Sequence, residues 1–146
     1  MDEANIRSRL EEALNEVDPD FGAFFLLRFF GLEVDYGDET CTVRIPTSDE
    51  MLNPQGTSLH GGITTMAIDI SMGHLCQRFL SPCVTIDMDL KFLRPITGPA
   101  RCEASFLKKG RRLVTVQSRV LDDQERLAVI ATGTWFRLPG EAEAGS

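Results

Sequence analysis

The stretch LHGGITTMAIDISMGHLCQRFL, residues Leu59–Leu80, decides the fold. A Gly-Gly pair leads into a run of helical length that is apolar nearly all round. On a helical wheel, Thr64, Ser71 and Arg78 form one narrow polar stripe with His74 beside it, and we expect this stripe to face water. A helix with so little polar surface is normally enclosed by other elements. The stretch therefore predicts one long central helix.

Asp69 breaks this pattern. It projects roughly 140–180° away from the polar stripe, on the side expected to be dry. A carboxylate there would be partly desolvated, which costs free energy unless the group is paired or has a use. Three interpretations are open. Asp69 is a buried structural acid with hydrogen-bond partners, or it is a functional group, or the predicted orientation of the helix is wrong and Asp69 is not on a dry side.

Gly61 and Gly62 stand at the predicted start of the helix. Residues without a β-carbon let a ligand approach the backbone closely. The first N–H groups of a helix are unpaired, and the macrodipole favours negative charge there. This is the outline of an oxyanion hole. The alternative is a tight turn that needs positive φ.

Composition narrows the class of protein. A chain of 146 residues is long enough for one domain with a sizeable core. The net charge of −7 argues against nucleic-acid binding. No apolar run reaches membrane-spanning length, and the acidic start lacks the apolar core of a signal peptide, so we expect a cytoplasmic protein. Four cysteines without zinc-type spacing predict free thiols and no metal site.

The pattern outside the central helix predicts an α+β fold. Residues 2–17 have the spacing of an amphipathic helix, and the aromatic run 21–30 is either core or a lid over a pocket. Alternating residues predict a sheet of five or six antiparallel strands wrapped around the helix. In the strand after the helix, we expect one dry face made of Val84, Ile86, Met88, Leu90 and Phe92. We predict one domain over residues 1–138 and a disordered tail over 139–146.

Three segments resemble one known family. NPQGTSLHGGITTMAID (53–69), VTIDMDLKFLRP (84–95) and GRRLVTV (110–116) are similar to hotdog-fold acyl-CoA thioesterases, in the branch named for the phenylacetate-pathway enzymes. The similarity covers roughly residues 32–136. An H-G-G followed eight residues later by an Asp is fairly specific for this branch. A related dehydratase is an alternative, but the His-and-Glu pattern of the dehydratases is absent here, which weakens it.

The resemblance implies a role for five residues. Asp69 would be the nucleophile or general base, and the Gly61 backbone N–H would polarise the thioester carbonyl. His60 and Asn53 would line the site, and Thr85 would place a hydroxyl near the attacking water. The loop from Asn53 to His60 is one residue longer than in relatives, which departs from the pattern at Asn53.

Geometry adds a constraint that needs no family. Asp69 lies about 12 Å from Gly61 along one helix, at 1.5 Å per residue. A base and an oxyanion donor must both reach one thioester. If Gly61 and Asp69 both act on one thioester, they must come from different subunits, so we expect a homodimer. The resemblance further implies that two such dimers assemble into a tetramer.

The expected substrate is an acyl-CoA, with coenzyme A entering as part of the substrate and no separate cofactor. Gly62 would lie beside the ligand, and the candidates for holding coenzyme A are basic: Arg94, Lys108, Lys109, Arg111 and Arg112. The alternative for the last four is a solvated hairpin tip. The alternative function is a non-catalytic acyl-CoA-binding or regulatory module of the same fold, because fold alone does not fix function.

Overall fold

The computed structural model describes residues 1–15 and 24–139. Its helices are α1 (Glu3–Asn15), α2 (Phe25–Phe29) and α3 (Gly61–Phe79), with a 3-10 turn at Asp49–Met51. Its strands are β1 (Glu33–Tyr36), β2 (Thr40–Ile45), β3 (Cys83–Phe92), β4 (Ala100–Lys109), β5 (Leu113–Asp122) and β6 (Leu127–Arg137). The predicted end of the first helix, the start of the aromatic run and most of the tail fall outside the described residues.

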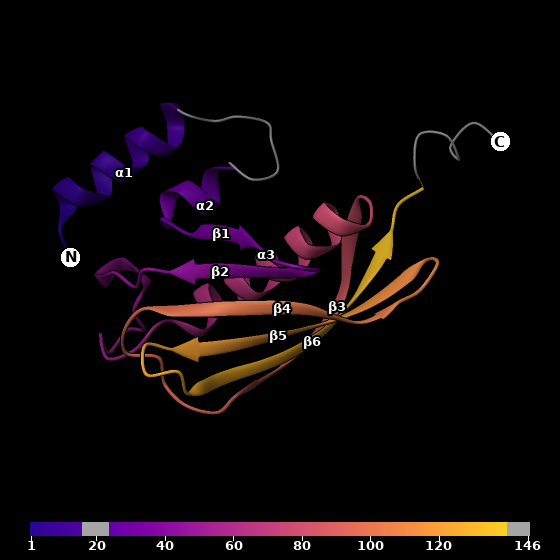
Figure 1. Cartoon of the computed structure of the whole chain (residues 1–146). Coiled ribbons are helices and arrows are strands. Elements are labelled where there is room, and N and C mark those ends of the chain that lie inside the picture. Colours follow the sequence, from indigo (N-terminus) through magenta and orange to yellow (C-terminus); the bar gives the residue numbers. More distant parts are fainter. Residues whose placement is uncertain (16–23, 140–146) are drawn as a thin grey trace.

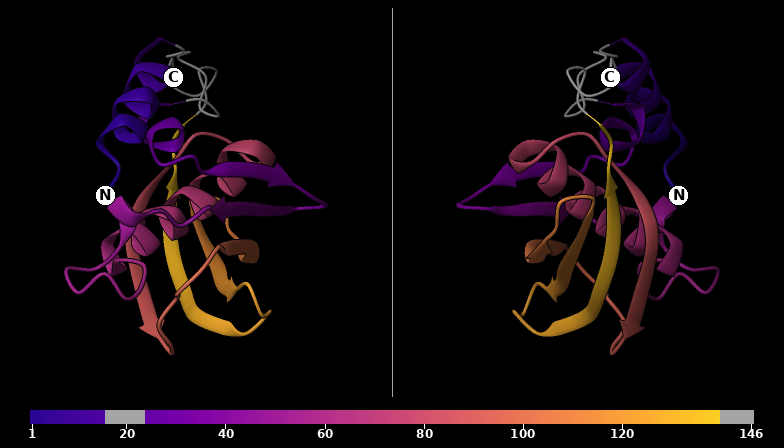
Figure 2. Two further views of the ribbon diagram at one scale, coloured as in Figure 1. Left: turned by 90° about the vertical axis from the view of Figure 1, so that its left-hand side faces the viewer. Right: turned by 90° about the vertical axis from the view of Figure 1, so that its right-hand side faces the viewer.

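The six strands form one antiparallel sheet in the order β1-β2-β4-β5-β6-β3. The sheet curves around α3, while α1 and α2 lie beyond the β1 edge (Figures 1 and 2). Fold class, central helix and strand number are therefore confirmed. Because β3 pairs only with β6 among the described strands, it forms the second edge of the sheet.

The core lies between α3 and the concave face of the sheet. Ile68, Met72 and Leu75 of α3 are completely buried, as are Val114 and Val116 of β5. Fully burying side chains of this size contributes about 1.5–3 kcal/mol each to stability. The long apolar helix of the sequence is thus the element on which the sheet closes.

The orientation predicted for α3 is wrong. Thr64, Ser71 and His74 of the supposed wet stripe are buried, and only Arg78 is exposed. The reason is that each buried polar group has an internal partner. The Ser71 hydroxyl hydrogen-bonds to the Ile68 carbonyl at 2.7 Å and to the Ser118 hydroxyl at 3.0 Å. The Thr64 hydroxyl donates to the His60 carbonyl at 3.3 Å.

The predicted dry face of β3 is also only half correct. Met88 and Leu90 pack against the core, but Val84, Ile86 and Phe92 are 46%, 53% and 55% exposed. For Val84 and Ile86 the physical cause is a β-bulge between Thr85 and Asp87, where the pairing register with β6 shifts by one residue. A single extra residue reverses the inward and outward positions of a strand. Phe92 is the last residue of β3 and lines a hollow at that end of the strand.

The cysteines are free thiols, as predicted. Cys41, Cys76 and Cys102 are buried and Cys83 is half-buried. Burial raises the pKa of the Cys41 and Cys76 thiols to about 12. Thiols with such a raised pKa are largely protonated at neutral pH and react slowly. None of the described helices is long and apolar enough to span a membrane.

Candidate active site

The N-terminus of α3 is fixed by backbone hydrogen bonds on both sides. The Leu59 N–H donates to the Ile96 carbonyl and the His60 N–H to the Met51 carbonyl, each at 2.8 Å. His60 is the N-cap, and its Nδ1 accepts a hydrogen bond from the Gly62 N–H at 2.9 Å. These contacts hold Gly61 as the first residue of the helix. Within the described residues, the Gly61 N–H has no hydrogen-bond acceptor.

Gly61 and Gly62 do not adopt a backbone conformation that requires glycine. Positive φ among the described glycines occurs at Gly31 and Gly56, and neither Gly61 nor Gly62 adopts it. The tight-turn alternative is therefore wrong. A β-carbon on Gly62 would lie 3.0 Å from the His60 Nδ1, so glycine there makes room for the capping ring. Gly62 has a structural reason to be glycine, whereas Gly61 meets only the Phe92 ring, at 3.6 Å.

A hollow of about 370 Å³ opens directly beside Gly61. Phe92 and Arg94 form part of its wall, together with Ser58, Leu59, Gly61, Thr64, Leu93, Pro95 and Ile96. Arg94 is anchored there because its Nε donates to the Leu127 carbonyl at 3.0 Å. The space thus combines an unpaired helix N-terminus, an apolar wall and a guanidinium. Such a combination suits a ligand with an apolar part and an anionic part.

Asp69 lies two turns further along α3, half-exposed and next to the β3 edge of the sheet. Its Oδ1 accepts a hydrogen bond from the Thr85 hydroxyl at 2.8 Å. The structure thus brings together the carboxylate and the hydroxyl that the resemblance placed at one site. It does not bring Asp69 to Gly61, because eight residues of one helix separate them by about 12 Å.

Asn53 is occupied within its own loop. Its Nδ2 donates to the Ser58 hydroxyl at 3.0 Å and to the Thr57 hydroxyl at 3.2 Å. Its Oδ1 accepts from the Thr57 N–H at 3.0 Å. Both ends of the amide therefore close the loop that leads into α3, a common use of Asn in turns. Within this loop, Asn53 therefore has a structural role.

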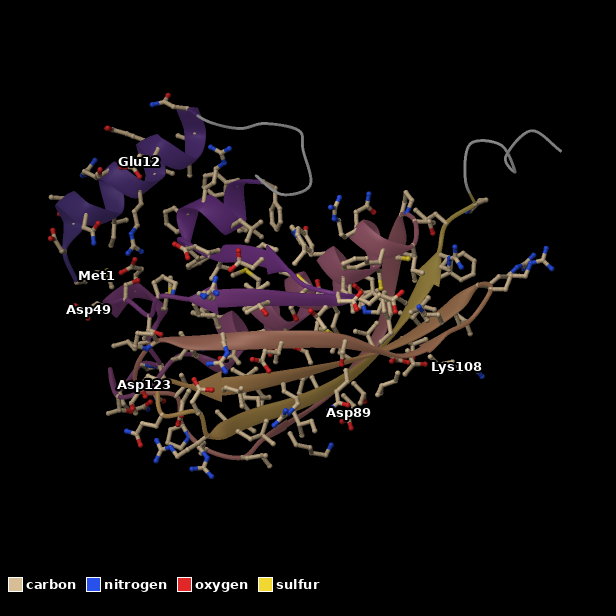
Figure 3. All side chains as sticks on the ribbon, viewed as in Figure 1. Met1, Glu12, Asp49, Asp89, Lys108 and Asp123 are labelled. Atoms are coloured by element: carbon tan, nitrogen blue, oxygen red, sulfur yellow. The ribbon has the colours of Figure 1, made fainter. Side chains whose placement is uncertain are left out.

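The predicted basic residues divide into two groups. Strand register places the 108–112 hairpin at the Cys83 end of the sheet, whereas Arg94 follows Phe92 at the opposite end. Strands of this length put about 30 Å between the ends. Figure 3 shows the separation, with Lys108 at one end and Asp123 at the other. Lys109 is also paired with Glu39, at 2.6 Å.

A second hollow, of about 320 Å³, contains none of the predicted site residues. Arg44 and Arg101 form part of its wall, but Arg44 is paired with Asp35 and Arg101 with Glu125. These ion pairs leave little net charge from the arginines for a ligand.

Comparison with known proteins decides the family. The model of the thioesterase superfamily matches residues 56–129, which include α3, β3, β4, β5 and the first residues of β6. The chain belongs to the thioesterase superfamily. It is 33% identical over 105 residues to a candidate esterase of Saccharolobus solfataricus, covering 70% of this chain and 74% of the relative.

Solved structures agree on the hotdog fold. A Bacillus halodurans protein, determined with coenzyme A, is 26% identical with a TM-score of 0.78, covering 91% of this chain and 88% of its own. The E. coli PaaI protein of the phenylacetic acid degradation operon is 19% identical with a TM-score of 0.74, covering 93% of this chain and 96% of its own. At 19% identity, the similarity to the PaaI protein shows the fold alone.

Sequence reasoning missed part of the site. Phe92 and Thr64 line the hollow beside Gly61, but Thr64 was assigned to the wet stripe and Phe92 to the core. An available signal for Phe92 was its position just before Leu93-Arg94-Pro95, at the end of a strand.

Proposed function

We propose that the protein hydrolyses acyl-CoA thioesters to a free acid and coenzyme A. The observation that carries the proposal is the hydrogen bond between Thr85 of β3 and Asp69 of α3. The N-terminus of the same helix presents the Gly61 N–H to an adjoining hollow. In the reaction, water supplies oxygen to the acyl carbon and the carbon–sulfur bond breaks. Coenzyme A leaves as the thiol and is part of the substrate, so no further cofactor is required.

In the proposed site, the thioester carbonyl accepts a hydrogen bond from the Gly61 N–H. The helix macrodipole stabilises the negative charge that develops on that oxygen. Asp69 of a second copy either attacks the acyl carbon or takes a proton from the attacking water. Thr85 holds the carboxylate through its 2.8 Å hydrogen bond.

A homodimer with antiparallel α3 helices would complete this site. Two features favour it: the Asp69 carboxylate is only half-buried in the single chain, and the β3 edge beside it carries exposed apolar side chains. Val84, Ile86, Phe92 and Leu93 are each between 46% and 55% exposed. Apolar residues gathered at a strand edge are typical of an interface.

The decisive experiment is a thiol-release assay over aryl and aliphatic acyl-CoAs of increasing length. We expect turnover with at least one class, followed as free coenzyme A by a colour reagent for thiols. Oxygen esters of the same acids serve as the comparison. Tight binding of acyl-CoA without release of thiol would contradict the proposal and favour the non-catalytic acyl-CoA-binding module.

Basic residues are expected to hold coenzyme A although the protein is acidic overall. Reversing Lys108 and Lys109 to Glu should raise KM several-fold and leave kcat unchanged, because uniform binding is what is lost. Arg7→Glu on α1 is the control, since Arg7 is exposed and pairs with Glu3. An unchanged KM would leave these lysines as a solvated hairpin tip, in which Lys109 only pairs with Glu39.

A further inference from the structure

The β-bulge in β3 determines which side chains face α3. Thr85 is opposite Trp135 of β6 and Asp87 is opposite Thr134, so Ile86 is an extra residue in β3. Bulges of this kind commonly re-aim a side chain beside an active site. Here the bulge directly follows Thr85, the partner of Asp69.

The side chains on the two sides of the bulge both point inward. Before it, the Thr85 hydroxyl reaches Asp69 on α3 at 2.8 Å. After it, Met88 packs against the core next to Met72 of α3, and both lie within contact distance of a β-carbon built on Gly133. Residues three apart in a regular strand face opposite sides of the sheet. Only a strand with one extra residue can aim both Thr85 and Met88 at the helix.

A competing register exists for this segment. Regular alternation through β3 would turn Val84 and Ile86 toward the core and Thr85 away from Asp69. The hydrophobic effect favours that register, because the bulge leaves Val84 and Ile86 about half exposed in the chain. In the single chain, before any partner covers these side chains, a specific contact must therefore stabilise the bulge.

The Asp87 side chain provides that contact. Its Oδ1 accepts a hydrogen bond from the backbone N–H of Thr134, at 3.1 Å, directly opposite the bulge. In a regular ladder, such an N–H would bond to a carbonyl of the neighbouring strand. We propose that Asp87 is a positioning residue whose carboxylate replaces that carbonyl, fixes the bulge and thereby keeps Thr85 aimed at Asp69.

This inference rests on the proposed function only for its kinetic test. Asp87→Ala removes the acceptor, whereas Asp87→Asn keeps an amide oxygen at the same place. We expect Asp87→Ala to lower kcat about tenfold or more, as misplacing a catalytic group does, with KM unchanged. Asp87→Asn should stay within about twofold of the wild-type kcat.

Asp89→Ala is the matched control, since Asp89 lies two residues further along β3 and pairs with Lys91 at the surface. It should leave kcat unchanged. A merely structural role for Asp87 would lower kcat independently of Thr85. We instead expect no further loss when Asp87→Ala is added to Thr85→Val, because residues that act through one another are non-additive. Additive losses would overturn the proposal.

A second measurement needs no catalysis. If Asp87→Ala releases the bulge, Cys83 turns from the α3 side to the outer side of the sheet. Its alkylation by iodoacetamide, read by mass spectrometry, should speed up several-fold relative to the wild-type and Asp89→Ala proteins. Should Asp87→Ala not fold, Asp87→Ser, whose hydroxyl is too short to reach Thr134, is measured the same way.

The two failures are distinguishable. Unchanged alkylation of Cys83 in a folded Asp87 variant overturns the positioning role, whatever the enzyme does. Faster alkylation in a protein that hydrolyses no thioester supports the hold on the bulge and overturns only the proposed function.

Discussion

Asp69→Asn is expected to fold normally and to lose most thioesterase turnover. Asn has nearly the same shape as Asp, and its side-chain oxygen can still accept the hydrogen bond that the Thr85 hydroxyl donates at 2.8 Å. The substitution removes the negative charge, and with it the nucleophile or general base. We therefore expect kcat to fall about 10²–10⁴-fold, the usual range for such a group.

The measurement is steady-state kinetics on the best acyl-CoA, with thermal unfolding as the check on folding. Asp89→Asn is the matched control, because it makes the same chemical change at an exposed carboxylate of β3. Its kcat should equal that of the wild-type protein. An Asp69→Asn protein with near wild-type kcat would show that Asp69 is a structural acid.

The periodicity of the sequence was enough to predict the fold. The long apolar run at 59–80 and the alternating strands after it specify a sheet around a helix, because each element must bury one face. The hairpin of β1 and β2 was predictable for the same reason, with Gly37-Asp38 between two strand patterns.

The rotation of α3 could not be predicted from hydropathy. Ser71 and Thr64 score as polar, yet each hydroxyl bonds to a helix carbonyl, which makes it compatible with the core. The wheel therefore assigned the polar stripe to water and Asp69 to the interior. In the chain Thr64, Ser71 and His74 are buried, and Asp69 is half-exposed beside Thr85 at the β3 edge.

The bulge at Ile86 could not be predicted from the sequence pattern either. Residues 84–92 alternate without a break, and nothing in their composition marks an extra residue. The register is decided by pairing with β6 and by the Asp87–Thr134 hydrogen bond, which are contacts between residues far apart in the sequence. The Asp69–Thr85 pair was accordingly suggested by family resemblance and not by periodicity.

Mixing two inactive variants is expected to restore activity, which tests the shared site directly. Gly61→Pro removes the backbone donor and Asp69→Asn removes the carboxylate chemistry. Pro suits position 61 because it is tolerated at the first residue of a helix. The residue before a Pro prefers extended backbone, and His60 already has φ −63° and ψ 134°. A β-carbon there makes an ordinary 3.6 Å contact with Phe92.

In a heterodimer, one of the two sites inherits both lesions and the other inherits neither. Random exchange of two-fold dimers from equal amounts of each parent should therefore give about a quarter of wild-type activity. Gly61→Ala, which keeps the N–H, separates loss of the donor from added bulk. Circular dichroism confirms that the parents fold, and mass spectrometry confirms that subunits exchange. Background activity after full exchange would mean that Gly61 and Asp69 do not meet across a dimer interface.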